Sequence, residues 1–484
     1  MEYHEAIGRL ERLRRLRPKL GTETTAALLA HLGDPHEGLP CVQVAGSNGK
    51  GSTASVLARV LREAGLTVGL YTSPDLNDRR ERVRVSGEKV PKRAVARFVE
   101  TAWPYVVDRS AEGDAPTFFE AVTALALWHF DREDVDVAVL EVGIGGRYDA
   151  TSVVDPVGGA VTAVSLEHTD IIGSTVEEIA RDKAQVAPAD RPLVTGATGE
   201  ALAAIREETD VLTVGDGSAV ETGSEPAREV DVRATETGMV SFAESSVSIA
   251  GPDWSVEAET PLLGAHQAVN AGIAAALARQ VADATGHAVT EDDLAAGVRN
   301  VSWPGRFEVM DDAPLTVLDG AHNPDACAKL AALCDRFEYD ALHLVFGAMR
   351  DKDHERMARA LPAAERVLLA EPAVERAQDT ETLQAVFERE TDAATERRPS
   401  VLDALAGALR AAGPEDCVLV AGSLHTVAEA RDRWTRAPAR VETDTTTRAR
   451  SVMESADVPA DARGERADRL VSRTVRLHLR AASA

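Results

Sequence analysis

The chain has 484 residues, of which 44% are hydrophobic, and this is enough for two or three buried cores. Its formal net charge is −26 and only seven residues are lysine, so it lacks the basic stripe that nucleic-acid binding requires. No apolar run has the length of a membrane-spanning helix, and the charged N-terminus lacks a signal-peptide core, so we expect a soluble, cytoplasmic protein without a membrane partner.

The strongly acidic composition is typical of proteins that stay soluble in concentrated salt, and it predicts a halophilic protein. The four cysteines, Cys41, Cys327, Cys334 and Cys417, do not have the spacing of metal ligands. We expect them to be buried free thiols.

Residues 1–33 have the apolar spacing of two amphipathic helices. They precede an apolar strand over 39–46, the loop Ser47-Asn48-Gly49-Lys50-Gly51-Ser52 and a helical run over 53–65. A strand, a glycine-rich loop and a helix in this order form the opening of a nucleotide-binding domain.

The glycines of this loop allow successive backbone N–H groups to face a phosphate, and the helix N-terminus adds partial positive charge. Lys50 would reach the terminal phosphates, and Ser52 would meet a phosphate or magnesium. The loop departs from the GxxxxGK[ST] pattern because Gly51 separates Lys50 from Ser52. The alternative is a glycine turn with a surface lysine, which the scarcity of lysine disfavours. We therefore predict that ATP binds at Asn48, Gly49, Lys50, Gly51 and Ser52.

Further strands are predicted over 66–72, 135–143, 158–166 and 191–197, with helices over 91–109, 117–131 and 174–187. This alternation predicts a doubly wound, mainly parallel sheet with helices on both faces. Residues 216–260 alternate in short stretches that are typical of antiparallel strands at a domain edge. A long alanine-rich helix is expected from Ala265 to Thr285.

After Trp303-Pro304-Gly305 a second strand–helix alternation begins, which predicts a smaller Rossmann-like α/β domain. The expected domains are an ATP-binding domain over 1–300 and a C-terminal domain over 301–436. Residues 437–484 are polar and repetitive, and we expect a linker-like tail with one short helix.

The spacing of Ala45 and Gly49-Lys50-Gly51-Ser52 resembles the folylpolyglutamate synthase and dihydrofolate synthase family of the Mur ligase superfamily. Further motifs occur in the order of that family and extend the resemblance over about residues 40 to 430. They are Tyr71-Thr72-Ser73-Pro74, Thr117-Phe118-Phe119-Glu120, Leu140-Glu141-Val142-Gly143-Ile144-Gly145-Gly146-Arg147, Glu167-His168-Thr169-Asp170, Asp182-Lys183-Ala184, Gly264-Ala265-His266-Gln267 with Asn270-Ala271, Pro304-Gly305-Arg306-Phe307-Glu308, Asp319-Gly320-Ala321-His322-Asn323-Pro324 and Val420-Ala421-Gly422-Ser423-Leu424.

The resemblance implies magnesium ligands at Ser73, Glu141 and His168. Their chemistry agrees, because Glu141 ends an apolar strand beside the phosphate loop and offers a hard ligand for the ion. One or two Mg²⁺ ions are expected, with K⁺ as a further cation. Taken alone, His168-Thr169-Asp170 is more typical of a turn or capping cluster.

Lys183 lies in a predicted helix and by itself reads as a solvated lysine. In the resembling family the matching lysine is carbamylated and helps to hold a second metal ion. A neutral amine accepts carbon dioxide only if its surroundings lower its pKa.

Thr117-Phe118-Phe119-Glu120 has the pattern of a capping box at a helix start. The resemblance adds that this segment borders the pterin site, where aromatic rings could support a flat heterocycle. It also implies folate binding at Arg147 and Asp149. We keep both interpretations of the segment.

In the second domain the resemblance implies nucleotide contacts at Arg306 and Asp319, with Asn270 of the first domain at the base. It also implies a catalytic role for His322, together with Lys50 and Lys183. The alternative for His322 is a residue of a helix-capping turn. One departure is Asp75, which stands where the family usually has histidine, and this puts any folate contact of that histidine in doubt.

These features predict an ATP-dependent ligase that adds L-glutamate to a folate or to dihydropteroate through an acyl phosphate. The partners are then small molecules, and the protein is expected to be a monomer. Because some members of the resembling family are fused to a dihydropteroate synthase, a fused or associated dihydropteroate synthase is also expected. The alternatives are a Mur-type ligase acting on another carboxylate and a P-loop ATPase without ligase activity.

Overall fold

The computed structural model describes residues 1–435 except 17–20, 168, 170, 218–219, 223–224 and 229. The described residues form two compact units: Met1–Thr237 with Glu244–Pro304, and Gly238–Ala243 with the chain from Gly305 to Thr435. The predicted tail over 437–484 lies outside the described residues. The division into domains over 1–300 and 301–436 stays a prediction. Across the described part of the chain, every helix is too short or too polar to cross a membrane.

The first unit is built on an eleven-stranded sheet with the order β13-β12-β11-β8-β7-β6-β1-β5-β2-β3-β4. The seven strands from β11 to β2 run parallel, whereas β3, β4 and the β12–β13 pair contribute antiparallel neighbours. The strands of this sheet are β1 Cys41–Ala45, β2 Val68–Tyr71, β3 Val83–Val85, β4 Glu88–Lys89, β5 Val137–Glu141, β6 Pro156–Val161, β7 Leu193–Thr195, β8 Val211–Gly215, β11 Val232–Ser241, β12 Glu244–Ala250 and β13 Ser255–Thr260. A separate pair consists of β9 Val220–Thr222 and β10 Glu225–Arg228.

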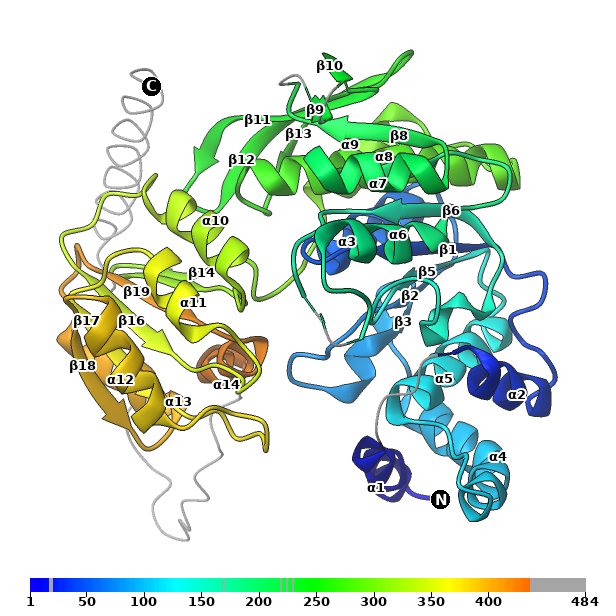
Figure 1. Ribbon diagram of the computed structural model, residues 1–484, viewed down its shortest axis with the longest axis horizontal. Helices are drawn as coiled ribbons and strands as arrows, with labels where there is room; N and C mark the ends of the chain where they lie inside the picture. Colours follow the sequence, from blue (N-terminus) through cyan, green and yellow to red (C-terminus); the bar gives the residue numbers. More distant parts are fainter. Residues whose placement is uncertain are drawn as a thin grey trace, which may run out of the picture. The chain divides into compact units, whose positions relative to one another are not determined.

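Helices cover both faces of this sheet (Figure 1). Alternate residues of β5 show how: Val137 and Val139 belong to the core beneath the helices α3 and α8, whereas Ala138 and Leu140 belong to the core beneath α4 and α5. The helices of this unit are α1 Tyr3–Arg12, α2 Glu23–His31, α3 Lys50–Glu63, α4 Lys92–Ala111, α5 Phe118–Arg132, α6 Val176–Lys183, α7 Gly199–Glu208, α8 Ala265–Thr285 and α9 Glu291–Arg299, with 3-10 turns at η1 Leu13–Arg15, η2 Arg79–Arg82, η3 Ala150–Val153 and η4 Ala184–Val186.

The second unit contains a six-stranded sheet with the order β14-β15-β19-β16-β17-β18, parallel except for the β14–β15 pair. Its elements are β14 Glu308–Asp312, β15 Leu315–Leu318, α10 Pro324–Cys334, β16 Leu342–Phe346, α11 His354–Ala360, β17 Arg366–Ala370, α12 Thr380–Glu390, β18 Ala394–Arg398, α13 Val401–Ala411, β19 Cys417–Ala421 and α14 Leu424–Thr435. The expected fold class, a mainly parallel doubly wound domain followed by a smaller α/β domain, is confirmed.

Two sequence-based expectations need refinement. The segment 216–260 was expected to be antiparallel; its strand β11 pairs in parallel with β8, whereas β9 with β10 and β12 with β13 show the expected antiparallel register. The strands β3, β14 and β18 were not predicted, because they are short or polar and carry little of the apolar pattern that indicates a strand. All four cysteines are buried free thiols, as expected.

Candidate active site

The phosphate loop joins the buried strand β1 to helix α3, which begins at Lys50. Gly46 and Gly49 have φ of 139° and 94°, which L side chains rarely adopt. A Cβ on Gly46 would also meet Thr162 Oγ1 at 2.0 Å, so both conformation and space require glycine there. Thr162 Oγ1 donates to the carbonyl of Asn48 over 2.7 Å, which ties the loop to the end of β6.

Lys50 points its ammonium group back into the loop. Its Nζ donates to the carbonyl oxygens of Gly46 at 2.8 Å and Ser47 at 3.4 Å. The position lies at the N-terminus of α3, where the backbone favours anionic ligands. Ser52 is buried in the first turn of the same helix, as a phosphate- or magnesium-facing hydroxyl would be.

Asn270, from helix α8, lies beside the phosphate loop. A Cβ on Gly49 would approach its Oδ1 to 2.5 Å, and its Nδ2 donates to Gln267 Oε1 over 2.9 Å. The structure thus brings together the predicted ATP-binding residues Asn270 and Gly49, which are distant in sequence. Gln267 orients the amide of Asn270, and its place in the Gly264-to-Gln267 motif was the available signal for this role.

Ser73 and Glu141 meet at the carboxyl ends of β2 and β5. These strands are parallel neighbours, with Tyr71 opposite Leu140, and the backbone N–H of Ser73 donates to Glu141 Oε2 over 2.9 Å. On its other side β5 pairs with β1, where Val44 lies opposite Glu141. The phosphate loop, Glu141 and Ser73 therefore follow three adjacent parallel strands and share one edge of the sheet.

The oxygen donors at this edge suit a magnesium ion. Glu141 is a 5%-exposed carboxylate and Ser73 carries a hydroxyl, and both are hard ligands. The third predicted ligand, His168, lies outside the described residues. Among the described residues no cluster of three His, Cys, Asp or Glu side chains could hold a metal, and the predicted set itself contains only one such residue there.

Lys183 ends helix α6 and is almost completely buried, with 2% of its surface exposed. The interpretation of this side chain as a solvated lysine is therefore wrong, because the packing of α6 against the sheet turns it inward. Its Nζ pairs with Glu167 Oε1 at 2.8 Å. Burial lowers the pKa of Lys183, Glu167 opposes this shift, and the charge of Lys50 adds to it. Carbamylation of Lys183 stays a prediction.

The segment from Thr117 to Glu120 forms the capping box expected at the start of α5. Glu120 N donates to Thr117 Oγ1 at 3.3 Å, and Thr117 N donates to Glu120 Oε2 at 2.6 Å. The other oxygen of Glu120 is buried without a hydrogen-bond partner among the described residues. The capping interpretation is confirmed, and it leaves the predicted role in folate binding untouched.

Phe119 and Asp149 converge on Gly143 after β5. A Cβ on Gly143 would lie 2.5 Å from Phe119 Cζ, and Asp149 Oδ2 accepts from the N–H groups of Gly143 and Ile144 at 3.0 Å each. Burial raises the pKa of Asp149, and these hydrogen bonds oppose the shift. Arg147 is exposed nearby. Phe119 and Asp149, two of the predicted folate-binding residues, thus lie next to each other beside Gly143, which belongs to the motif at the end of β5.

In the second unit Asp319 follows β15 and is partly buried. It accepts from Phe307 N and Ala321 N, both at 2.8 Å, so it fixes the turn that carries Arg306. Burial raises the pKa of Asp319, whereas Arg306 and the two N–H groups lower it. A Cβ on Gly320 would lie 2.6 Å from Arg306 Nη1, so the predicted nucleotide residues Arg306 and Asp319 are neighbours.

His322 precedes helix α10, but the cap of that helix is Asn323, whose Oδ1 accepts from Ala326 N at 2.9 Å. Asn323 is thus the capping residue and His322 lies in the turn just before it, so the alternative of a turn residue stands and the catalytic role of His322 stays a prediction. Its Nδ1 lies 2.8 Å from the carbonyl oxygen of Gly320. Because a carbonyl only accepts, Nδ1 carries the proton, and the lone pair of the neutral ring lies on Nε2.

Comparison with known proteins identifies two family models within the chain. Residues 44–278 match the Mur ligase middle domain, and residues 305–424 match the Mur ligase glutamate ligase domain. The chain is 32% identical to the folylpolyglutamate synthase of Lacticaseibacillus casei over 89% of its length and 98% of the relative's. The chain belongs to the folylpolyglutamate synthase and dihydrofolate synthase family.

Solved members of the family have the same fold. The Escherichia coli protein FolC, in complex with DHPP and ADP, superposes with a TM-score of 0.75 at 29% identity and covers 90% of this chain and 97% of its own. The folylpolyglutamate synthase of Mycobacterium tuberculosis, complexed with ADP and AMPPCP, gives a TM-score of 0.79 at 28% identity, over 90% of this chain and 100% of its own.

A relative in Haloferax volcanii is a probable bifunctional folylpolyglutamate synthase/dihydropteroate synthase. It is 55% identical over 98% of this chain but only 56% of its own length. The chain therefore spans little more than half the length of this member of the family.

In the present chain, two further polar residues contact the predicted site but were not predicted as site residues. Glu167 pairs with Lys183, and Asp182 Oδ2 accepts from Gly146 N at 2.9 Å in the turn that carries Arg147. Both belong to motifs that supported the resemblance. Nothing in the local pattern indicated their partners, which are 16 and 36 residues away.

Proposed function

We propose that this chain is an ATP-dependent ligase that joins L-glutamate to a folate or to dihydropteroate through an acyl phosphate, releasing ADP and phosphate. One observation carries the proposal: the phosphate loop, Glu141 and Ser73 follow three adjacent parallel strands in a chain of this family. A nucleotide's terminal phosphates and a magnesium ion would be needed at one place for phosphoryl transfer, and these strands supply groups for both.

Lys50 has the role of neutralising charge on the transferred phosphoryl group. In the structure its ammonium is held by the loop carbonyls of Gly46 and Ser47, and it would exchange these acceptors for phosphate oxygens. Ser73 and Glu141, with His168, would hold magnesium. When bound, that ion would offset negative charge on the phosphates during transfer.

The amine of glutamate must lose a proton before or as it attacks the acyl phosphate. His322 is suited to accept it, because the bond from Nδ1 to the Gly320 carbonyl leaves the basic lone pair on Nε2. That hydrogen bond orients the imidazole and fixes its tautomer before any substrate binds. We assign His322 the role of base.

The flat ring of the substrate is assigned to the segment from Thr117 to Glu120 with Asp149. Phe118 and Phe119 supply aromatic surface there, and the buried oxygen of Glu120 that has no partner among the described residues could accept from a ring N–H. The names of the relatives support both glutamate addition to folates and dihydrofolate synthesis. We further propose a fused or associated dihydropteroate synthase, as in the bifunctional relative of Haloferax volcanii.

The test is an assay of ATP consumption at high potassium chloride with dihydropteroate or tetrahydrofolate, with and without glutamate. The expected result is ADP formation that requires both carboxylate and glutamate, with a product heavier by one glutamyl residue. Consumption of ATP that does not require glutamate would support a P-loop ATPase instead. Activity with neither folate substrate would overturn the folate assignment.

A further inference from the structure

Asp75, which stands where the family usually has histidine, is a buried carboxylate in the loop after β2. Its side chain is only 2% exposed and forms ion pairs with two arginines of the same loop. Arg82 Nε lies 2.6 Å from Asp75 Oδ1, and Arg79 Nη1 bonds to Asp75 Oδ2. With so little surface, Asp75 cannot contact a substrate as an exposed histidine could. Any effect on the substrate must pass through its arginine partners.

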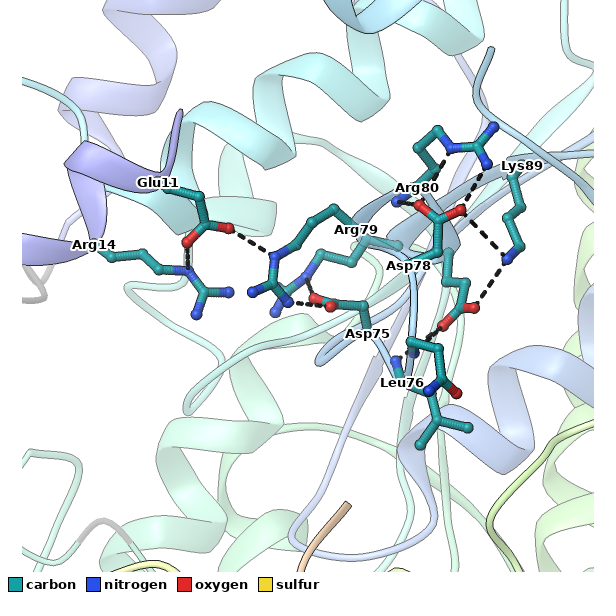
Figure 2. Close-up of polar contacts among 11 residues, drawn as sticks. Glu11, Arg14, Asp75, Leu76, Asp78, Arg79, Arg80 and Lys89 are labelled. Carbon is teal, nitrogen blue, oxygen red and sulfur yellow. Dashed lines mark hydrogen bonds and ion pairs between the residues drawn. The ribbon is translucent and has the colours of Figure 1, made fainter. Parts of the chain in front are cut away.

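The ion pairs continue from this loop to the N-terminal helix (Figure 2). Arg79 Nε lies 2.7 Å from Glu11 Oε1, and Arg14 Nε lies 2.9 Å from the other oxygen of Glu11. Two carboxylates thus alternate with three guanidinium groups, in the order Arg14, Glu11, Arg79, Asp75 and Arg82. The chain of contacts ties α1 and η1 to the loop after β2.

Both ends of this chain of charges lie on the same aromatic ring. The guanidinium carbons of Arg14 and Arg82 are 4.4 Å and 5.3 Å from the centre of the Phe118 ring. Contacts at these distances are cation–π interactions. Phe118 is the first residue of α5, within the segment assigned to the substrate ring, so the network ends at the proposed substrate site.

The charges of the network do not cancel. Three arginines face two carboxylates, which leaves one excess positive charge in a protein whose formal net charge is −26. A pair as buried as Arg82 and Asp75 is screened by salt much less than an exposed pair. Arg82 is therefore held in place at salt concentrations that weaken more exposed ion pairs, such as that of Arg14 and Glu11, whose side chains are 38% and 31% exposed.

We propose that Asp75 and Glu11 are positioning residues that fix Arg14 and Arg82 against Phe118 as a cationic, aromatic-backed site for a substrate that joins a flat ring to a carboxylate. Arginine suits this role, because its planar group stacks on rings and forms paired hydrogen bonds with carboxylates. The inference rests on the proposed function, since dihydropteroate and folates have this chemistry. It assigns to Asp75 an indirect role in place of a direct contact.

The test compares Asp75→Asn and Asp78→Asn. Asparagine keeps the size of the side chain and removes its charge, so Arg82 and Arg79 lose their shared anchor. Asp78 is the matched control, because it lies in the same loop and pairs with Arg80 and Lys89, but is 26% exposed. We expect Asp75→Asn to raise the KM for dihydropteroate about tenfold with little change in kcat or in the KM for ATP, and Asp78→Asn to match the wild type. Asp75→Glu should recover part of the loss.

Dihydropteroate binding, followed by titration calorimetry without ATP, gives a readout that does not need turnover. Weaker binding by Asp75→Asn and by the second variant Glu11→Gln, with unchanged thermal unfolding, is the expected result. Glu11→Gln decides the matter if Asp75→Asn fails to fold. Wild-type affinity in the folded variants, or no binding of dihydropteroate by the wild type, would overturn the inference. If the wild type turns over substrate and Asp75→Asn has the same KM and affinity for dihydropteroate, the proposed function stands and only the positioning role of Asp75 is refuted.

Discussion

The indole of Trp303 lies against Gly51 of the phosphate loop. A Cβ on Gly51 would come within 2.5 Å of Trp303 Cζ2, which real Cβ atoms essentially never do. The indole Nε1 is buried and has no hydrogen-bond partner among the described residues. Trp303 is the residue before Pro304, where the first unit ends, so the last segment of that unit packs on the loop that is expected to hold phosphate.

Gly51→Ala should therefore weaken ATP binding and lower stability. The added methyl group must displace the ring or the loop, and overpacking of this kind costs about 1–3 kcal/mol. ATP titration and thermal unfolding measure the two effects. The double variant Gly51→Ala/Trp303→Ala should regain ATP affinity, because it removes the clash. Gly8→Ala is the control, since a Cβ there meets nothing within 4 Å and alanine favours a helix. Wild-type ATP affinity in Gly51→Ala would contradict the packing argument.

Lys50→Ala should abolish turnover in a folded protein. The loop is held without this side chain by the bonds from Thr162 to Asn48 and from Ser47 N to the Ala163 carbonyl. Losing a charge contact in the transition state costs on the order of 3 kcal/mol or more, which is about a hundredfold in rate. ATP consumption and circular dichroism provide the measurement, with Lys329→Ala, at a partly exposed lysine of α10, as control. Near-normal turnover in folded Lys50→Ala would refute the assignment of the phosphate loop.

His129 should make stability depend on pH. The side chain is buried in α5, and burial lowers its pKa while Glu133, 3.8 Å away, opposes the shift. The unfolded chain therefore binds a proton near the ordinary pKa of about 6.5, whereas the folded chain binds it only at lower pH. Stability from the neutral imidazole is complete above about pH 6.5 and is lost as the pH falls from there toward the folded pKa, with a slope of at most about 1.4 kcal/mol per pH unit.

Urea unfolding between pH 5 and 8 tests this dependence. His129→Gln should flatten the acidic part of the profile relative to the wild type, because the titrating group is gone. His287→Gln, which removes an exposed histidine, serves as the control. Equal pH slopes in wild type and His129→Gln would show that this histidine does not control the acid response.

Salt should stabilise the protein. A formal charge of −26 repels itself across the surface, and the Debye length falls from about 10 Å at 0.1 M to about 3 Å at 1 M salt. We expect the melting temperature to rise between low and molar potassium chloride, with more than about 1 M needed for full stability. A melting temperature that stays constant over this range would be evidence against the effect of surface repulsion.

Truncation after Arg440 tests the predicted tail, which lies outside the described residues. Helix α14 ends at Thr435 and completes the packing against β15 and β19, so the shortened chain retains every described element. We expect ATP-dependent ligation of glutamate to persist. Loss of this activity in a folded, truncated protein would place residues 441–484 in the active unit.

Much of the fold could be predicted from the sequence because the signals are local. The apolar strand before Ser47, the glycines of the loop and the helix after it are determined by neighbouring residues, as is the capping box of Thr117 and Glu120. Periodicity reports which face of an element is apolar, and this was enough for the alternation of strands and helices in both units. The ordered motifs then placed the chain in its family.

Only the tertiary structure decided which of these residues meet. Ser73 and Glu141 are 68 residues apart and are joined because β2 and β5 are neighbours in a sheet whose order the sequence does not state. The burial of Lys183, the contact of Trp303 with Gly51 and the ion pairs that run from Asp75 to Glu11 depend on long-range packing in the same way. The pattern of side chains along the sequence indicates local conformation and polarity. Which residue pairs with a given charge depends on the folded chain, because folding brings together residues that long loops separate in the sequence.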